Sequence, residues 1–221
     1  ADVAAYSGTK LMGGQGRVLA GAVCGTREFI NEKLLAMQRH TGPNLSPFNA
    51  WVVLKGLETL DLRARHQSES ALKVAQFLEG RVPRINFPGL QSHPQHALAM
   101  KQMDACGPIF SFEVENREQA FAVLNALELI DISNNIGDSR TLMCHNASTT
   151  HYSVTAEARE EMGVTEGMLR INVGVEDPED LIEDLDQALA GPGVDGPQDA
   201  VDHVFMPTVN SITKAKATKV K

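Results

Sequence analysis

Cysteine and long apolar runs are both scarce in this chain of 221 residues. Its three cysteines, Cys24, Cys106 and Cys144, are odd in number and form no CxxC pair. This disfavours a disulfide framework or a zinc site, and it favours reduced thiols and a cytoplasmic location. No apolar stretch approaches the roughly 20 residues of a membrane-spanning helix. The chain is therefore predicted to have no membrane partner and no metal.

Positive charge is also in deficit, since the formal net charge is −8. A nucleic-acid surface would be expected to show a basic footprint, so nucleic acid is disfavoured as a partner. Apolar residues at 43% and charged residues at 22% are typical of a globular protein. The composition favours a protein that handles small molecules, with a length that suits one large domain or somewhat more.

The first 61 residues predict two strands and the beginning of a helical region. ADVAAYS indicates a buried strand, and RVLAGAVCG indicates a second one. Thr26 is placed to cap a helix over residues 26–42. Ser46 followed by Pro47 predicts the start of a long helix that ends at Gly80, with Gly56 marking a bend or a close contact.

From residue 62 onward the pattern changes, and we predict a second, small α+β domain over residues 62–190. Short apolar stretches alternate with helical ones, and the last helix has a clear start at Asp177 and Pro178. Residues 191–221 are rich in Gly, Pro, Asp and Lys, which predicts a flexible tail with no part in catalysis. The strands are expected at 84–87, 109–115, 129–133, 141–145 and 168–174, and the helices at 94–103, 117–127, 155–163 and 178–190.

The segment YSGTK places one lysine, Lys10, after a predicted strand and beside two hydroxyls and a glycine. A lysine there is either an exposed residue at a strand end or a group that forms a Schiff base. The second role requires partial desolvation, so that the amine can attack a carbonyl. Ser7 and Thr9 would supply hydroxyl donors to a phosphate, and Gly8 would permit a close backbone approach.

Four long segments together resemble one family, in the order in which the family has them. They are ADVAAYSGTKLMGGQGRVLAGAV, TGPNLSPFNAWVVLKGLETLDLRAR, ISNNIGDSRTLMCHNASTTH and EGMLRINVGVEDPEDLIEDL. The family comprises the pyridoxal 5′-phosphate (PLP) enzymes of cysteine and methionine metabolism. Within it, the chain is most similar to the sulfhydrylases that act on O-succinylhomoserine. The resemblance covers residues 1–190 and only the back half of the family's length.

The resemblance implies an α/β fold, the C-terminal part of the type I PLP aminotransferase-like fold. Residues 1–61 would end the large cofactor domain. Lys10 matches the lysine that forms a Schiff base with PLP, and Ser7 and Thr9 match hydroxyls that bind its phosphate. Arg170 matches the arginine that binds the substrate α-carboxylate, a role that suits a guanidinium. Judged without the family, Arg170 would be taken for a surface residue of a strand.

Two further positions enter through the resemblance as substrate-binding residues. Thr150 matches a hydroxyl close to the cofactor, although on its own it is an ordinary loop threonine. Asn135 stands where the family's lyases usually have serine, and its N-x-GD context is typical of the sulfhydrylases. His145 and His151 suggest acid–base roles, but a structural role is the better interpretation of both.

The implied reaction is a γ-replacement in methionine biosynthesis, in which sulfide and O-succinylhomoserine give homocysteine and succinate. The implied assembly is a homo-oligomer, a dimer of dimers. An O-acetylhomoserine sulfhydrylase or a methionine or cystathionine γ-lyase remains open. So does an inactive fragment, because we expect a segment upstream of Ala1 to supply other parts of the cofactor site.

Overall fold

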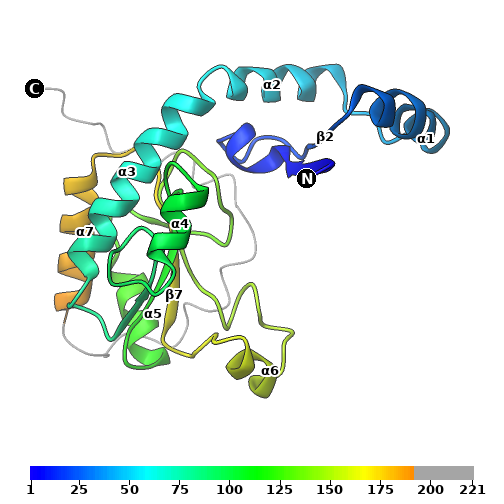
Figure 1. Cartoon of the computed structure of the whole chain (residues 1–221). Coiled ribbons are helices and arrows are strands. Elements are labelled where there is room, and N and C mark those ends of the chain that lie inside the picture. Colours follow the sequence, from blue (N-terminus) through cyan, green and yellow to red (C-terminus); the bar gives the residue numbers. More distant parts are fainter. Residues whose placement is uncertain (192–221) are drawn as a thin grey trace, which may run out of the picture.

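The computed structural model describes residues 1–191, so the predicted tail lies outside the described residues except for Gly191. It contains a two-stranded sheet near the N-terminus and a five-stranded sheet farther along the chain. A long helix, α3 (Leu60–Leu78), leads from the first part to the second, as Figure 1 shows. The architecture is mixed α/β, as predicted.

The small sheet is an antiparallel pair of β1 (Val3–Ser7) and β2 (Gly21–Gly25). The turn between the strands begins with a short π-type helix, η1 (Gly8–Met12). The prediction of a buried first strand is wrong for the described chain, because Val3 is 41% exposed and Tyr6 is 55% exposed. The reason is that, within residues 1–191, these two strands pack mainly on each other and on the adjoining η1 and η2.

The predicted helix after Thr26 is present and has two parts, η2 (Phe29–Leu34) and α1 (Leu35–Thr41). The Phe29 N–H donates to Thr26 Oγ1 at 3.2 Å, which confirms the cap. Ser46 likewise accepts from the Asn49 N–H at the start of α2 (Pro47–Leu57).

The single long helix that was predicted after Ser46 is in fact two helices, α2 and α3. The chain breaks between them at Glu58 and Thr59, and Thr59 has non-helical backbone angles of φ −114° and ψ 7°. The turn lets Arg63, one turn into α3, donate back to the carbonyl of Gly56 at 2.8 Å. Gly56 therefore lies close to the bend.

The five-stranded sheet has the order β3-β4-β7-β6-β5. All neighbouring strands are antiparallel except β5 and β6, which are parallel. The alternation expected for FSFEVE is confirmed, because burial alternates along β4. Its strands are β3 (Arg84–Asn86), β4 (Ile109–Glu113), β5 (Asp131–Ile132), β6 (Leu142–His145) and β7 (Met168–Asn172).

Helices cover one face of this sheet, and the apolar core lies between them. Phe110, Phe112, Leu169 and Ile171 extend from β4 and β7 into this core, and each is at most 3% exposed. The opposite face carries Asn86, Ser111 and Arg170, and part of it is buried, since Leu142, Cys144 and Asn172 are each at most 2% exposed. The remaining helices are α4 (His96–Gln102), α5 (Arg117–Ala126), α6 (Ala156–Glu161) and α7 (Pro178–Ala190).

All of the residues in the core cluster lie between residues 71 and 188, whereas the first 62 residues carry many exposed apolar side chains. Trp51 is 54% exposed and Phe48 is 69% exposed. This contrast is consistent with a boundary near residue 61, which stays a prediction. Within residues 1–191, none of the helices has both the length and the apolarity to cross a membrane.

Gly56 fits the second of its two predicted roles as well as the first, because α2 lies against η1 there. A Cβ at position 56 would lie 2.2 Å from the Met12 carbonyl oxygen and 2.8 Å from that of Gly13. Both atoms belong to backbone, so relief of the overlap would require α2 and the segment after Lys10 to separate.

We therefore expect Gly56→Ala to destabilise the protein by about 1–3 kcal/mol, the usual result of overpacking. The sign of this change in stability is informative, because helix propensity alone would make the alanine variant more stable by roughly 1 kcal/mol. The denaturant midpoint measures the change. Gly21→Ala is the control, since its Cβ would lie 3.7 Å from the nearest atom, an ordinary contact. Equal midpoints for both variants would contradict the prediction.

Candidate active site

Lys10 is the centre of the candidate site, and its amine is fixed by a residue far along the chain. Lys10 Nζ donates to Asn135 Oδ1 at 2.6 Å. The two residues are 125 positions apart, and Asn135 lies in the irregular segment that follows β5. The structure thus brings together two residues that the sequence indicated separately.

The backbone of Lys10 is held as closely as its amine. Its angles of φ −88° and ψ −130° depart from the surrounding helical turn. Gly137, at φ +71°, packs against this backbone, since a Cβ there would be 2.5 Å from the Leu11 nitrogen and 2.9 Å from the Lys10 carbonyl carbon. Only glycine combines that backbone conformation with so close an approach. Arg63 of α3 adds a bond of 3.0 Å to the Leu11 carbonyl.

The two hydroxyls beside Lys10 differ in how far the protein already uses them. Ser7 is exposed at the end of β1, and its side chain makes no capping hydrogen bond to η1. Thr9 Oγ1 accepts from the Ala20 N–H at 3.0 Å, while its donation to the Ala20 carbonyl is long at 3.4 Å. Both hydroxyls can therefore donate a hydrogen bond to an anion. These residues fit the lysine and phosphate parts of a PLP site.

Arg170 lies on the face of the five-stranded sheet opposite the apolar core and is partly buried. Strand register aligns it with Ser111 on one side and Cys144 on the other, and Ser111 in turn with Asn86. Arg170 Nη2 donates to the main-chain carbonyl of Asn134 at 2.8 Å. Arg170 and Lys10 are therefore held by consecutive residues, Asn134 and Asn135.

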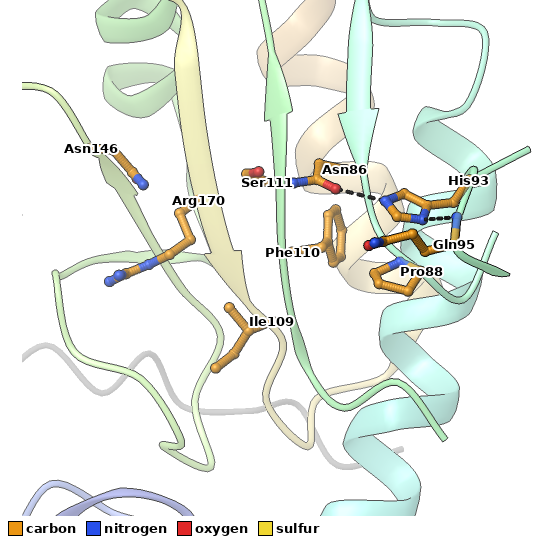
Figure 2. Close-up of a pocket in the computed structure, with 9 residues that line it drawn as sticks. All are labelled: Asn86, Pro88, His93, Gln95, Ile109, Phe110, Ser111, Asn146 and Arg170. Carbon is orange, nitrogen blue, oxygen red and sulfur yellow. Dashed lines mark hydrogen bonds between the residues drawn. The ribbon is translucent and has the colours of Figure 1, made fainter. Parts of the chain in front are cut away.

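A hollow of about 420 Å³ extends from Arg170 across β4 to the segment after β3. Figure 2 shows Arg170 and Asn146 on one side of β4, with Asn86 and His93 on the other. His93 Nε2 and Asn86 Oδ1 are 2.9 Å apart, which orients the ring. The lining is mostly polar and uncharged, so Arg170 is the group there that can bind a carboxylate.

Cys144, the neighbour of Arg170 on β6, adds no charge beside the guanidinium. Burial raises the pKa of the Cys144 thiol, and the nearby Arg170 opposes the rise. The thiol is therefore protonated at neutral pH and does not pair with the guanidinium as an anion.

Thr150 lies apart from these groups in the contacts that the structure describes. It is exposed, and its hydroxyl is 2.8 Å from His151 Nδ1 and 3.4 Å from the Asn146 carbonyl. No hydrogen bond within residues 1–191 joins it to Lys10, Asn135 or Arg170. Its predicted role stays a prediction.

His145 has the structural role that the sequence analysis preferred. Its Nδ1 is 2.8 Å from Ser148 Oγ, and its Nε2 is 2.8 Å from the Glu166 carbonyl oxygen. The ring also lies against Phe121, with 5.0 Å between the centroids. Because both nitrogens already have partners, His145 is not available to a substrate.

Sequence reasoning missed the residues that support the site. Asn134 acts through its main-chain carbonyl, which has no sequence signature. Gln67 and Asn172 are buried amides that bond to the backbone next to Gly137. Their only signal is that a polar residue interrupts an apolar pattern, so contacts between distant segments were needed to find them.

Comparison with known proteins assigns the fold and the lysine segment to one family. The family profile of Cys/Met metabolism PLP-dependent enzymes matches residues 1–190. The O-succinylhomoserine sulfhydrylase of Mycobacterium tuberculosis is 48% identical over 196 residues, which are 86% of this chain and 48% of that protein. The L-methionine gamma-lyase of Treponema denticola is 42% identical over 193 residues, again 86% of this chain and 48% of that protein.

Solved structures agree with this result. A cystathionine gamma lyase from Micromonospora echinospora superposes with a TM-score of 0.83 at 36% identity, covering 87% of this chain and 51% of that one. A cystathionine gamma synthase from Xanthomonas oryzae gives a TM-score of 0.81 at 38% identity, covering 86% and 50%.

The fold and the lysine segment thus define part of a PLP-dependent enzyme of the type that these structures represent. The chain belongs to the family of Cys/Met metabolism PLP-dependent enzymes. It spans about half the length of the curated relatives that it matches.

The environment of His145 makes the stability of this region depend on pH. Burial, the largest cause, lowers the pKa of His145 below 6.5; the hydrogen bond to the Glu166 carbonyl opposes this shift, and Arg117 and Arg159 add to it. The unfolded chain then binds the proton more readily than the folded chain. Stability is therefore complete above about pH 6.5 and falls as pH decreases toward the folded pKa. We expect His145→Gln to reduce this fall in the free energy of unfolding at acidic pH.

The measurement is the free energy of unfolding by denaturant between pH 5 and 8, for wild type and His145→Gln. Glutamine keeps an amide donor for the Glu166 carbonyl but cannot titrate in this range. The difference in stability between the two proteins should be larger at pH 8 than at pH 5. A constant difference across the range would contradict the assignment.

Proposed function

We propose that this chain carries the lysine and the carboxylate-binding arginine of a PLP-dependent sulfhydrylase. The reaction would be a γ-replacement in which sulfide displaces succinate from O-succinylhomoserine to give homocysteine, a step of methionine biosynthesis. The observation that carries the proposal is that Asn134 and Asn135 hold Arg170 and Lys10 at adjacent positions. The name of the M. tuberculosis relative supports the choice of reaction.

Each residue has a role that its contacts support. PLP, when bound, supplies the electron sink for chemistry at the substrate. Lys10 would attach the cofactor through its amine and then move protons at Cα and Cβ of the substrate. Ser7 and Thr9 would donate to the cofactor phosphate. Arg170 would bind the α-carboxylate and so orient the Cα–H bond toward Lys10.

Asn135 and Thr150 would contact the substrate or the cofactor. Asn135 already contacts the amine of Lys10, so it is placed to influence where that amine delivers a proton. The acyl group, succinyl or acetyl, is a finer choice that rests on the sulfhydrylase relatives from M. tuberculosis and Pseudomonas aeruginosa.

We also propose that the whole protein is a cytoplasmic homo-oligomer, a dimer of dimers. The exposed apolar side chains of the first 62 residues support association, because an isolated chain seldom leaves so many large apolar groups in water. The three cysteines, all of them free, support a reducing compartment.

The first test concerns the lysine. When PLP is added and the mixture is reduced with borohydride, we expect the pyridoxyl group on Lys10, located by peptide mass spectrometry. Lys10→Arg should abolish labelling, because the guanidinium does not form the link. Lys101→Arg, at an exposed position, should leave labelling unchanged. A pyridoxyl group on another lysine of the wild-type protein would overturn the assignment.

The second test concerns the reaction. We expect homocysteine formed with sulfide to exceed 2-oxobutanoate formed without it, because Asn135 stands where the family's lyases have serine. Asn135→Ser should raise the share of 2-oxobutanoate. Asn134→Ser is the matched control, since Asn134 contacts Arg170 through its main chain only. Dominant 2-oxobutanoate from the wild-type enzyme would favour a γ-lyase, as in the T. denticola relative.

A further inference from the structure

Both site side chains depend on a segment that has no regular secondary structure. The segment, residues 134–138, follows β5 and precedes β6. Asn134 accepts from Arg170, and Asn135 accepts from Lys10. A segment without helical or strand hydrogen bonds keeps its position only through other contacts. The question is which contacts fix it.

Two buried amide side chains fix the far end of this segment. Asn172 Oδ1, on β7, accepts from the Gly137 N–H at 2.7 Å. Gln67 Nε2, on α3, donates to the Asp138 carbonyl at 2.7 Å and to the Val173 carbonyl at 2.8 Å. Gln67 is 0% exposed and Asn172 is 1% exposed. They thereby connect a helix, a strand and the segment.

The same end of the segment touches the backbone of Lys10. Gly137, which Asn172 holds, is the residue whose Cβ would overlap with the Leu11 nitrogen. Ser139 N–H also donates to the Gly14 carbonyl at 2.8 Å, four residues beyond Lys10. A shift of Gly137 would therefore move the Lys10 backbone and, through Asn135, the Lys10 amine as well.

The hydrogen bonds of Gln67 argue against a role in which this side chain only packs in the interior. Its Oε1 is buried and has no hydrogen-bond partner within residues 1–191, while its Nε2 serves two carbonyls. An unpartnered amide oxygen is unfavourable in the interior, so a purely packing position would suit leucine better. The amide is useful here for its N–H donors, which fix the segment.

We propose that Asn172 and Gln67 are positioning residues, which set the places of Lys10 and Arg170 together by holding the backbone of Gly137 and Asp138. The importance of this positioning for catalysis rests on the proposed function, whereas the positioning itself rests on the hydrogen bonds alone. It predicts that loss of either amide changes the environment of the Lys10 amine, although neither residue touches that amine.

The experiment measures the rate at which acetic anhydride acylates Lys10 in the intact protein, read by peptide mass spectrometry against Lys101 as an internal reference. Asn172→Leu keeps the branched shape with the same number of side-chain heavy atoms, Gln67→Leu shortens the side chain by one heavy atom, and both remove the amide. We expect each to raise the Lys10 rate about fivefold, as the loss of one hydrogen bond to the amine would. Should a leucine variant not fold, Gln67→Asn withdraws the same amide by one methylene and gives the same test.

The matched control is Asp184→Asn. Asp184 is also buried, at 6% exposed, and it accepts from the backbone N–H groups of Glu128, Leu129 and Ile130. It contacts neither Lys10 nor Arg170, so its loss should lower stability and leave the relative Lys10 rate unchanged. Asn172→Asp keeps an acceptor for the Gly137 N–H but loses the Nδ2 contact of 3.5 Å to the Asp138 carbonyl, so its Lys10 rate should lie between those of wild type and Asn172→Leu.

A Lys10 rate that stays at the wild-type value in both leucine variants, while stability falls as in Asp184→Asn, would overturn the proposal. Because acylation requires no turnover, this outcome is distinct from failure of the proposed reaction. If the sulfhydrylase function also holds, the variants should raise KM and lower kcat together, since Arg170 and Lys10 shift as one. A fall in kcat alone, proportional to the loss of folded protein, would also overturn the proposal.

Discussion

The hydrogen bond between Lys10 and Asn135 is the constraint on which the rest of the site depends. It joins the N-terminal strand pair to the segment after β5, across 125 residues. A lysine side chain has many rotamers and loses considerable entropy when it is fixed, so a single acceptor would hold it poorly if that acceptor could move. The acceptor is held through Gly137, which packs on the Lys10 backbone and donates to Asn172 of β7.

Two kinds of interaction hold the two parts of the chain. The five-stranded sheet and its helices share a dry apolar core, in which Leu169, Ile171, Leu181 and Leu185 are fully buried. The lysine segment has little core of its own. It is attached by directional polar contacts, above all the bonds of Arg63 to the carbonyls of Leu11 and Gly56. Apolar burial therefore stabilises the five-stranded sheet and its helices, whereas hydrogen bonds fix the position of the lysine segment.

Local signals in the sequence predicted the elements of the second region well. Asp177 starts a helix where capping chemistry placed it, the helix expected from residue 155 is present as α6, and the alternation in β4 matches its burial. Predictions failed where tertiary contacts decide. The break at Thr59 and the exposure of β1 depend on what packs nearby, and periodicity contains no such information. The resemblance indicated Lys10, Arg170 and Asn135, but only the fold could show that the short segment containing Asn135 holds both Lys10 and Arg170.

The sequence separation within the site has a consequence for the order of folding. Three contacts of the site close chain loops of very different lengths. They join Lys10 to Asn135, Arg63 to Leu11, and Gln67 to Asp138. Long loops are closed at a greater entropic cost, so contacts of this kind form after local helices and hairpins. Asn135, the acceptor for the Lys10 amine, reaches its final position only once β7 has joined the sheet and Asn172 has formed its hydrogen bond to Gly137. Lys10 is synthesised before the residues that hold its amine, yet its reactive environment is among the last features of the chain to be completed.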